Sequence, residues 1–597
     1  CLQPEIEESP GMVKSAFGTP NRVKTGLLVL CLMLLTACGG GGGGGDSEAP
    51  SYSDSVSDSV SDSAPDTVIG EEALPMPVSN AAFRSTHFAG SAVCASCHNN
   101  LSDDTAADVS IESDWSTSMM AQSARDPFYR AKVASEMQRN PQLKDVLDNK
   151  CSRCHAPMAN VEAKFEGSDV ALFGNGFLNP KNPYYDRAMD GVSCTSCHQI
   201  ADDGNLGTPS GFSGGFSIVD LGTSAERTAF GQYDNARINP MLNATDFRPT
   251  FATHISDSEV CASCHNLKTQ FVDAEGIVAS TTPDTEFPEQ MVYTEWENSS
   301  FASGPTPRSC QDCHMPAASG VRISNRPMNL GARDDFSRHS LVGANTTMLD
   351  IMAQNRDALG ITATGFDTAI ARTRTMLESS ADFEILNQSR VNNELIVQLR
   401  IINRSGHKLP TSYPSRRIYI HFVVRDDAGN VIFESGETRS DGSIAGVDAD
   451  ADASLFEPHY DEITRSDQVQ VYEAIMADTD SRVTYTLLRA AGYAKDNRIT
   501  PDGFDKNLVP DDVRVAGVAL TDGDFDGGRD IITYRVDVGT ANPVSFEAEL
   551  KYQSLGYAFV TDLLRDIDHP EVARFAAFYD KARIRAETIA SLSGSQP

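Results

Sequence analysis

With 597 residues the chain is too long for a single hydrophobic core, so we expect two or three domains. Its content of 40% hydrophobic and 22% charged residues is typical of a soluble globular protein. The 49 basic and 83 acidic residues give a formal net charge of -34, and no basic stripe offsets it. This charge repels polyanions and argues against nucleic acid as a partner.

The N-terminus has the pattern of an export signal. A basic segment precedes the apolar run 26–35, which is too short to span a membrane. The run ends in Leu-Thr-Ala-Cys at Cys38, which resembles the bacterial lipoprotein signal, in which this cysteine is lipidated. The resemblance implies a signal peptide over residues 1–37 and, because Gly39 follows the cysteine, an exported lipoprotein of the outer membrane, on its periplasmic or cell-surface face. An ordinary signal peptide that ends near a cysteine is the alternative.

Residues 38–80 are predicted to form a flexible tether. A run of glycines is followed by a repeat of serine and aspartate, which has nothing to bury in a core. The folded body should therefore begin near residue 80.

Ten of the 13 cysteines form five pairs with the same pattern, Cys-x-x-Cys followed directly by histidine. The five motifs are Cys94, Cys97, His98; Cys151, Cys154, His155; Cys194, Cys197, His198; Cys261, Cys264, His265; and Cys310, Cys313, His314.

This pattern is the attachment sequence of haem c, in which two thiols form thioethers with the porphyrin and the histidine is the proximal iron ligand. Structural zinc uses four ligands from paired half-sites and does not require the adjacent histidine. A disulfide across two residues would stabilise little, although disulfides suit an exported protein. We therefore predict five covalently bound haems, which form the core of a mostly α-helical or irregular cytochrome domain over residues 81–345.

Part of the cytochrome domain is duplicated. His87 and His254 each precede a motif by seven residues, and Trp115 and Trp296 each open a Trp-x-x-Ser sequence. Each copy closes with Cys-x-x-Cys-His-x-Pro, the second and fifth motifs, so the third motif lies in an insert between two-haem copies. Because the duplication places them identically, His87 and His254 are candidate sixth ligands of haem iron.

Two further residues are candidates for the sixth position. His339 lies just past the last motif and could fold back onto the haems. Met119 is the non-histidine candidate, although a core methionine is the simpler interpretation.

Beyond residue 345 the hydrophobic pattern changes. Residues 346–381 have helical spacing and should form connecting helices, whereas 382–552 contain alternating runs that predict a β-sandwich domain. The alternating runs lie at 395–401, 417–425, 468–476, 482–488, 530–538 and 544–550. Residues 553–597 are predicted to form C-terminal helices, the last of them over 569–592.

At this point a family resemblance becomes visible. The strings NRSGHKLPTSYPSRR at 403–417, FEPHYDEI at 456–463 and LKYQSLGYAF at 550–559 resemble the C-terminal region of large multihaem c-type cytochromes of bacterial outer membranes and cell surfaces. The haem region is similar to the tetrahaem cytochromes of ammonia oxidation. The resemblance implies electron transfer, and it implies that His407 and, less strongly, His459 face a haem. His407 is therefore also a candidate sixth ligand of haem iron.

Calcium is a second candidate cofactor. Asp522, Asp524, Asp526 and Asp530 have the spacing of the start of an EF-hand loop, although Thr533 stands where that loop has glutamate. Asp448, Asp450 and Asp452 repeat the alternate spacing without the glycine. Solvated acidic turns are the alternative for both stretches.

Two functions remain open. The first is a carrier that passes electrons between periplasmic redox proteins and outer-membrane or extracellular partners, held to the membrane by a lipid anchor and able to form a homo-oligomer or filament. The second is a reductase or oxidase of a small nitrogen or sulfur compound at one open haem iron. Pentahaem nitrite reductases have lysine in place of histidine at the active-site haem, whereas all five motifs here end in histidine. This difference favours the carrier, which is not an enzyme.

Overall fold

The structure, a computed structural model of the chain, describes residues 75–218 and 226–597. The predicted signal peptide, Cys38 and most of the tether lie outside the described residues. Among the helices of the described ranges, none is both long enough and apolar enough to cross a membrane.

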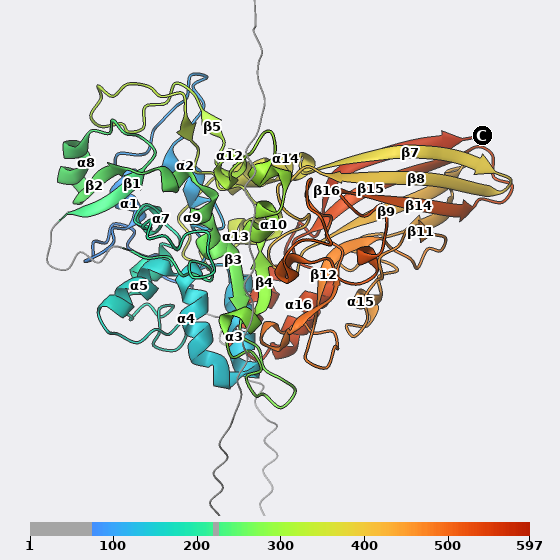
Figure 1. Ribbon diagram of the computed structural model, residues 1–597, viewed down its shortest axis with the longest axis horizontal. Coiled ribbons are helices and arrows are strands. Elements are labelled where there is room, and N and C mark those ends of the chain that lie inside the picture. Colours follow the sequence, from blue (N-terminus) through green and yellow to red (C-terminus); the bar gives the residue numbers. More distant parts are fainter. Residues whose placement is uncertain (1–74, 219–225) are drawn as a thin grey trace, which may run out of the picture. The chain divides into compact units, whose positions relative to one another are not determined.

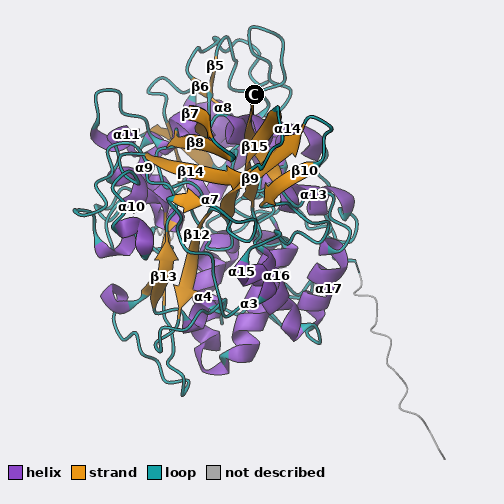
Figure 2. Ribbon diagram, turned by 90° about the vertical axis from the view of Figure 1, so that its right-hand side faces the viewer, coloured by secondary structure: helices purple, strands orange, loops and turns teal. Residues whose placement is uncertain are grey.

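The N-terminal region consists of short helices joined by long loops (Figures 1 and 2). Its helices are α1 (Ser91–Ala95), α2 (Ile111–Ser116), α3 (Pro127–Arg139), α4 (Lys144–His155), α5 (Pro157–Phe165), α6 (Tyr185–Met189), α7 (Cys194–Cys197), α8 (Ile238–Thr245), α9 (Ser258–His265), α10 (Val292–Glu297), α11 (Ser300–Ser303) and α12 (Cys310–His314). Three two-stranded sheets pair β1 (Arg227–Gly231) with β2 (Phe247–Phe251), β3 (Asn266–Thr269) with β4 (Phe287–Met291), and β5 (Ala317–Ala318) with β6 (Phe336–Ser337).

Every Cys-x-x-Cys-His motif starts in a helix, namely α1, α4, α7, α9 or α12. Residues three and four apart lie on the same face of a helical turn, so a helical start places the two thiols and the histidine of one motif on one side. This local geometry is the one that attachment to a single porphyrin requires.

Two connecting helices follow, as predicted: α13 (Thr346–Gln354) and α14 (Phe366–Glu378). Met348, Ile351, Phe366 and Ile370 from these helices pack in one core with Phe575 of α17 (Pro570–Tyr579). This core packs the connecting helices against the C-terminal helix α17.

The C-terminal half contains two packed sheets. One has the strand order β11-β14-β8-β7 and the other β13-β12-β9-β15-β16, with β10 paired to β9 (Figure 1). The strands are β7 (Ala381–Val391), β8 (Glu394–Asn403), β9 (Arg417–Asp426), β10 (Val431–Ser435), β11 (Glu462–Ile463), β12 (Val471–Ala477), β13 (Gly492–Asp496), β14 (Arg529–Asp537), β15 (Val544–Gln553) and β16 (Glu587–Gln596). Alternate residues of β8, β9, β14 and β15 share one core, so the two sheets form a sandwich.

The fold differs from the sequence-based prediction in two places. The run 482–488 forms only an isolated bridge at Val483 and part of a 3-10 turn, not a strand. The helix predicted over 569–592 ends at Tyr579, and the chain then forms strand β16 against β15. The C-terminal segment therefore contains α16 (Tyr557–Leu563), α17 and a strand of the sandwich rather than helices alone.

The cytochrome region contacts the C-terminal helices through α3. Arg139 of α3 forms ion pairs of 2.7 Å with both Asp562 and Asp566, and Arg130 donates from Nε to Glu571 at 2.9 Å. Burial of these groups strengthens the pairing. The described residues accordingly form one compact unit.

Candidate haem-binding site

The imidazole rings of four motif histidines are oriented in the same way. In each ring Nδ1 contacts a backbone carbonyl oxygen: His98 to Ile323 at 2.6 Å, His155 to Ser123 at 3.1 Å, His198 to Phe230 at 2.6 Å, and His314 to Val342 at 2.6 Å. A carbonyl oxygen can only accept, so Nδ1 carries the proton of the neutral ring and Nε2 keeps its lone pair. This is the tautomer and orientation of an axial iron ligand.

Burial favours the neutral form of six candidate ligand histidines. It lowers the pKa of His155, His265 and His339 to about 4, and it lowers the pKa of His98, His198 and His407 as well. A neutral imidazole is the form that binds a metal.

Two of the predicted sixth ligands lie opposite a motif histidine. The ring centres of His198 and His339 are 6.3 Å apart with an interplanar angle of 26°, and those of His314 and His407 are 6.4 Å apart at 18°. In His339 and His407, too, Nδ1 contacts a backbone carbonyl, of Ser337 at 3.0 Å and of Lys408 at 2.9 Å.

These separations fit an iron atom between the two rings. Two metal–nitrogen bonds of about 2.0 Å, and about 1.2 Å from each nitrogen to its ring centre, separate two axial imidazoles by about 6.4 Å. Direct ring stacking would require much closer contact. The chain's own residues thus fit haem c at the third and fifth motifs.

The other candidate sixth ligands have different surroundings. His87 is buried, contacts Glu162 through Nδ1 at 3.2 Å and stacks on Phe165. His254 donates from Nε2 to the carbonyl of Ile200 at 2.9 Å, so only its Nδ1 has a lone pair for a metal. Iron ligation by His87 or by His254 remains a prediction.

Met119 is partly buried against the core of α13, α14 and α17 and lines a small hollow with Ser340 and Val342. Met119 therefore lies near the segment that carries His339, but no contact among the described residues identifies an iron that it would bind. Its role as a ligand also remains a prediction.

The remaining histidines have partners within the sandwich or its helices. His421 of β9 lies between Glu434 and Glu549, with ring nitrogens 3.0 and 3.3 Å from their carboxylates. His569 caps α17, accepting from the backbone N–H of Glu571. His459 is buried next to acidic residues instead of a motif histidine.

Of the predicted calcium ligands, Asp522 and Asp530 come together, and His459, which was not predicted as one, joins them with ligand atoms within 4.8 Å of one another. The amide groups of Gln470 and Asn497 both donate to Nδ1 of His459 at 3.0 Å. The neutral ring therefore carries its proton on Nε2, which donates to Asp522 at 2.9 Å.

The rest of the acidic loop is arranged differently from an EF-hand. Asp524 and Asp526 are exposed. The Lys506 ammonium donates to the carbonyls of Ala519, Asp522 and Phe525, so three loop oxygens already face a cation. In the second acidic stretch Asp450 is paired with Arg417, at 2.8 Å for both bonds. Calcium binding stays a prediction.

The two tryptophans of the duplicated region form equivalent hydrogen bonds. The indole N–H of Trp115 donates to the carbonyl of Val192, and that of Trp296 donates to the carbonyl of Arg308, both at 2.9 Å. Val192 and Arg308 each lie two residues before the first cysteine of a motif, the third and the fifth. The two tryptophans thus make equivalent contacts just before the third and fifth motifs, whereas the sequence pattern aligns the second motif with the fifth.

The attachment segments are also neighbours in space. Helix α1 contacts α7, and α9 contacts α12. The side chains of Cys94 and Cys194 interact, as do those of Cys261 and Cys310, and those of Cys154 and Cys264. Haems attached to these cysteines would be bound at adjacent sites.

Three residues of the site were missed by sequence reasoning. The ring of Tyr129 lies parallel to that of His155 at 3.7 Å, and Asp114 and Glu295, which directly precede the two tryptophans, are buried. No local signal identifies Tyr129. The duplication could have identified the carboxylates, because both copies have an acidic residue at the same position.

Comparison with known proteins gives two findings. Residues 93–199, which contain the first three motifs, match the model of the family "Cytochrome c554 and c-prime". A solved structure, a penta-heme cytochrome c552 from Thermochromatium tepidum, is similar with a TM-score of 0.46 and 15% identity, over 85% of this chain and 99% of that chain. No curated protein matches the chain. The family match and the five attachment motifs together support a multihaem c-type cytochrome with covalently bound haem.

Proposed function

We propose that the protein is a pentahaem electron carrier that exchanges electrons between periplasmic redox proteins and outer-membrane or extracellular partners. The observation that carries the proposal is the pairing of His198 with His339 and of His314 with His407 at the separation of two axial ligands. Bound haem c supplies an iron that takes up and releases one electron. An iron with two histidine ligands has no open position for a substrate, so these residues favour electron transfer over catalysis.

The surroundings of the attachment sites support the same function. The thiols of the first and third motifs interact, as do those of the fourth and fifth and of the second and fourth. Adjacent attachment sites keep successive electron carriers close together. The chain's role is then to hold them, exclude water and fix their axial ligands.

The two histidines can be tested separately in the holoprotein. In His339→Ala and in His407→Ala we expect one of the five haems to change from low-spin to high-spin and to bind carbon monoxide, because the sixth ligand is lost. His421→Ala, which removes a histidine between two sandwich carboxylates, is the control and should leave the spin state unchanged. Unchanged spectra in both test variants would refute the ligand assignment.

We also propose that Cys38 carries a lipid that anchors the protein to the outer membrane. The proposal rests on the sequence from Leu35 to Cys38. Cys38→Ser should move the protein from the membrane fraction to the soluble fraction or leave its signal peptide uncleaved. Membrane association that is unaffected by this change would contradict the anchor.

A redox enzyme acting at the second haem is the second candidate. The hydroxyls of Tyr129 and Tyr413 are buried without a hydrogen-bond partner among the described residues, and both side chains lie close to Cys151. Burial raises both pKa values well above 10, so each tyrosine keeps a proton to donate. Binding and turnover of nitrite or hydroxylamine by the unmodified holoprotein would favour this enzyme over the carrier.

A further inference from the structure

Two buried carboxylates occupy equivalent positions in the duplicated region. Asp114 directly precedes Trp115 and Glu295 directly precedes Trp296, and their side chains are 2% and 0% exposed. The two tryptophans bind the segments that lead into the third and fifth motifs. Each carboxylate therefore belongs to the surroundings of one of these motifs.

Asp114 binds the neighbour of a candidate iron ligand. Arg338, which directly precedes His339, forms two hydrogen bonds of 2.9 Å with the carboxylate of Asp114, one from Nε and one from Nη2. Arg372 of α14 adds a third at 2.7 Å. Paired bonds of this kind fix both distance and orientation, so Asp114 holds the segment of His339 in place.

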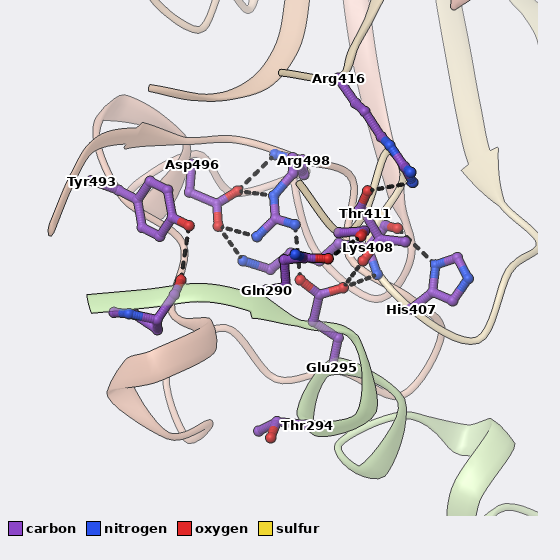
Figure 3. Close-up of polar contacts among 12 residues, drawn as sticks. Gln290, Thr294, Glu295, His407, Lys408, Thr411, Arg416, Tyr493, Asp496 and Arg498 are labelled. Atoms are coloured by element: carbon purple, nitrogen blue, oxygen red, sulfur yellow. Dashed lines mark hydrogen bonds and ion pairs between the residues drawn. The ribbon is translucent and has the colours of Figure 1, made fainter. Parts of the chain in front are cut away.

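Glu295 binds the neighbour of the other candidate ligand (Figure 3). The backbone N–H of Lys408, which directly follows His407, donates to Oε2 of Glu295 at 3.2 Å, and the hydroxyl of Thr411 donates to the same oxygen. Arg498 lies 2.9 Å from Oε1. Glu295 thereby holds the loop between β8 and β9, which carries His407, against α10 of the cytochrome region.

The contacts of Asp114 and Glu295 follow the same pattern. In each case, a residue adjacent to a histidine of the proposed axial pair donates to the carboxylate, and an arginine from beyond residue 345 contacts the same carboxylate. A carboxylate in a dry interior must be hydrogen-bonded and neutralised, so its partners are strongly held in place.

We propose that Asp114 and Glu295 are equivalent positioning residues, which hold His339 over the third haem site and His407 over the fifth. The inference rests on the proposed function, because it assumes that these histidines are sixth ligands. Neither carboxylate touches the iron. Each acts through the chain segment that it binds.

The test uses the complete holoprotein and the isosteric changes Asp114→Asn and Glu295→Gln. An amide keeps the shape but loses the charge and one acceptor oxygen, so the histidine segment should become less firmly held. In each variant we expect electron paramagnetic resonance to show that one of the five haems is at least partly high-spin. Carbon monoxide binding should rise toward one molecule per chain.

Matched controls are available in the sandwich. Asp450→Asn removes a buried carboxylate that also forms two bonds of 2.8 Å with an arginine, Arg417, and Glu473→Gln removes the partner of the buried Lys495 at 3.1 Å. Neither carboxylate binds a segment next to a candidate ligand. We expect both controls to keep the spectrum of the unmodified protein.

The outcomes separate this inference from the proposed function. If His339→Ala and His407→Ala change the spin state while folded Asp114→Asn and Glu295→Gln do not, the positioning role is wrong and the carrier stands. If the alanine variants also have no effect, both proposals fall. If a carboxylate variant does not fold, Arg338→Lys and Thr411→Val provide the same measurement. Arg338→Lys keeps the charge but loses the paired bonds to Asp114, and Thr411→Val loses the bond to Glu295. Low-spin spectra in both variants would overturn the inference.

Discussion

Asp496, at the end of β13, shows how a single buried residue depends on its partners. It is 1% exposed and accepts hydrogen bonds from Nε and Nη2 of Arg498 at 2.8 and 2.7 Å, and from Nζ of Lys408 at 2.7 Å (Figure 3). Burial alone would raise the pKa of this carboxyl. The charges of Arg498 and Lys408 outweigh burial and lower the pKa from 3.8 to about 2.

This lowered pKa predicts a loss of stability in acid. The charged form of Asp496 contributes about 2 kcal/mol above pH 4, and the contribution is lost as the pH falls from 4 through 2. Asp496→Asn should remove this pH dependence and, because it leaves buried cations with fewer partners, cost about 3–5 kcal/mol at pH 7. Urea unfolding followed by circular dichroism across this pH range measures both effects. Equal stability of the variant and the unmodified protein at pH 7 would contradict the network.

The residues that sequence could identify are those whose chemistry depends on a fixed local spacing. The five motifs are visible because attachment and ligation of haem c need two cysteines and a histidine within five residues. His339 and His407 were predicted as sixth ligands, from nearness in sequence and from resemblance, and the structure places each beside a motif histidine. Asp114 and Glu295 were missed, because their partners lie more than 100 residues away in sequence.

At the scale of elements, the alternating pattern identified the central strands of the sandwich. β8, β9, β14 and β15 begin and end close to the predicted runs, since one face of each strand is buried in a continuous core. β16 was predicted as helix because its residues have no strong strand preference. Pairing with β15 decides its conformation, a tertiary effect that local propensity cannot reveal.

Two leucines of the same sheet test where this core lies. Leu399 of β8 is fully buried, whereas Leu386 of β7 is 38% exposed. Leu399→Ala should lower the free energy of unfolding by about 2–5 kcal/mol through lost burial and a cavity, and Leu386→Ala should cost much less. Chemical unfolding of both variants checks the difference. A similar cost at the two positions would mean that the sheet is packed differently.

At the scale of the whole molecule, the haem sites are built from distant parts of the chain. The carbonyl that orients His98 belongs to Ile323, 225 residues away, and His407 reaches the fifth motif from a loop of the sandwich. The β-sandwich is therefore part of the proposed redox site. Such long-range assembly explains why the sequence predicted the cofactor and the domains more completely than the ligand arrangement.

One chain is proposed to carry five haems that exchange electrons. A coulometric titration of the complete holoprotein, in which electrons are counted as the optical spectrum changes, tests this proposal most directly. We expect uptake of five electrons per chain, one for each motif, with spectra of low-spin c-type haem at the third and fifth sites. If the haem absorption bands do not change as electrons are added, or if the cysteines bind zinc instead, the five-haem assignment is contradicted.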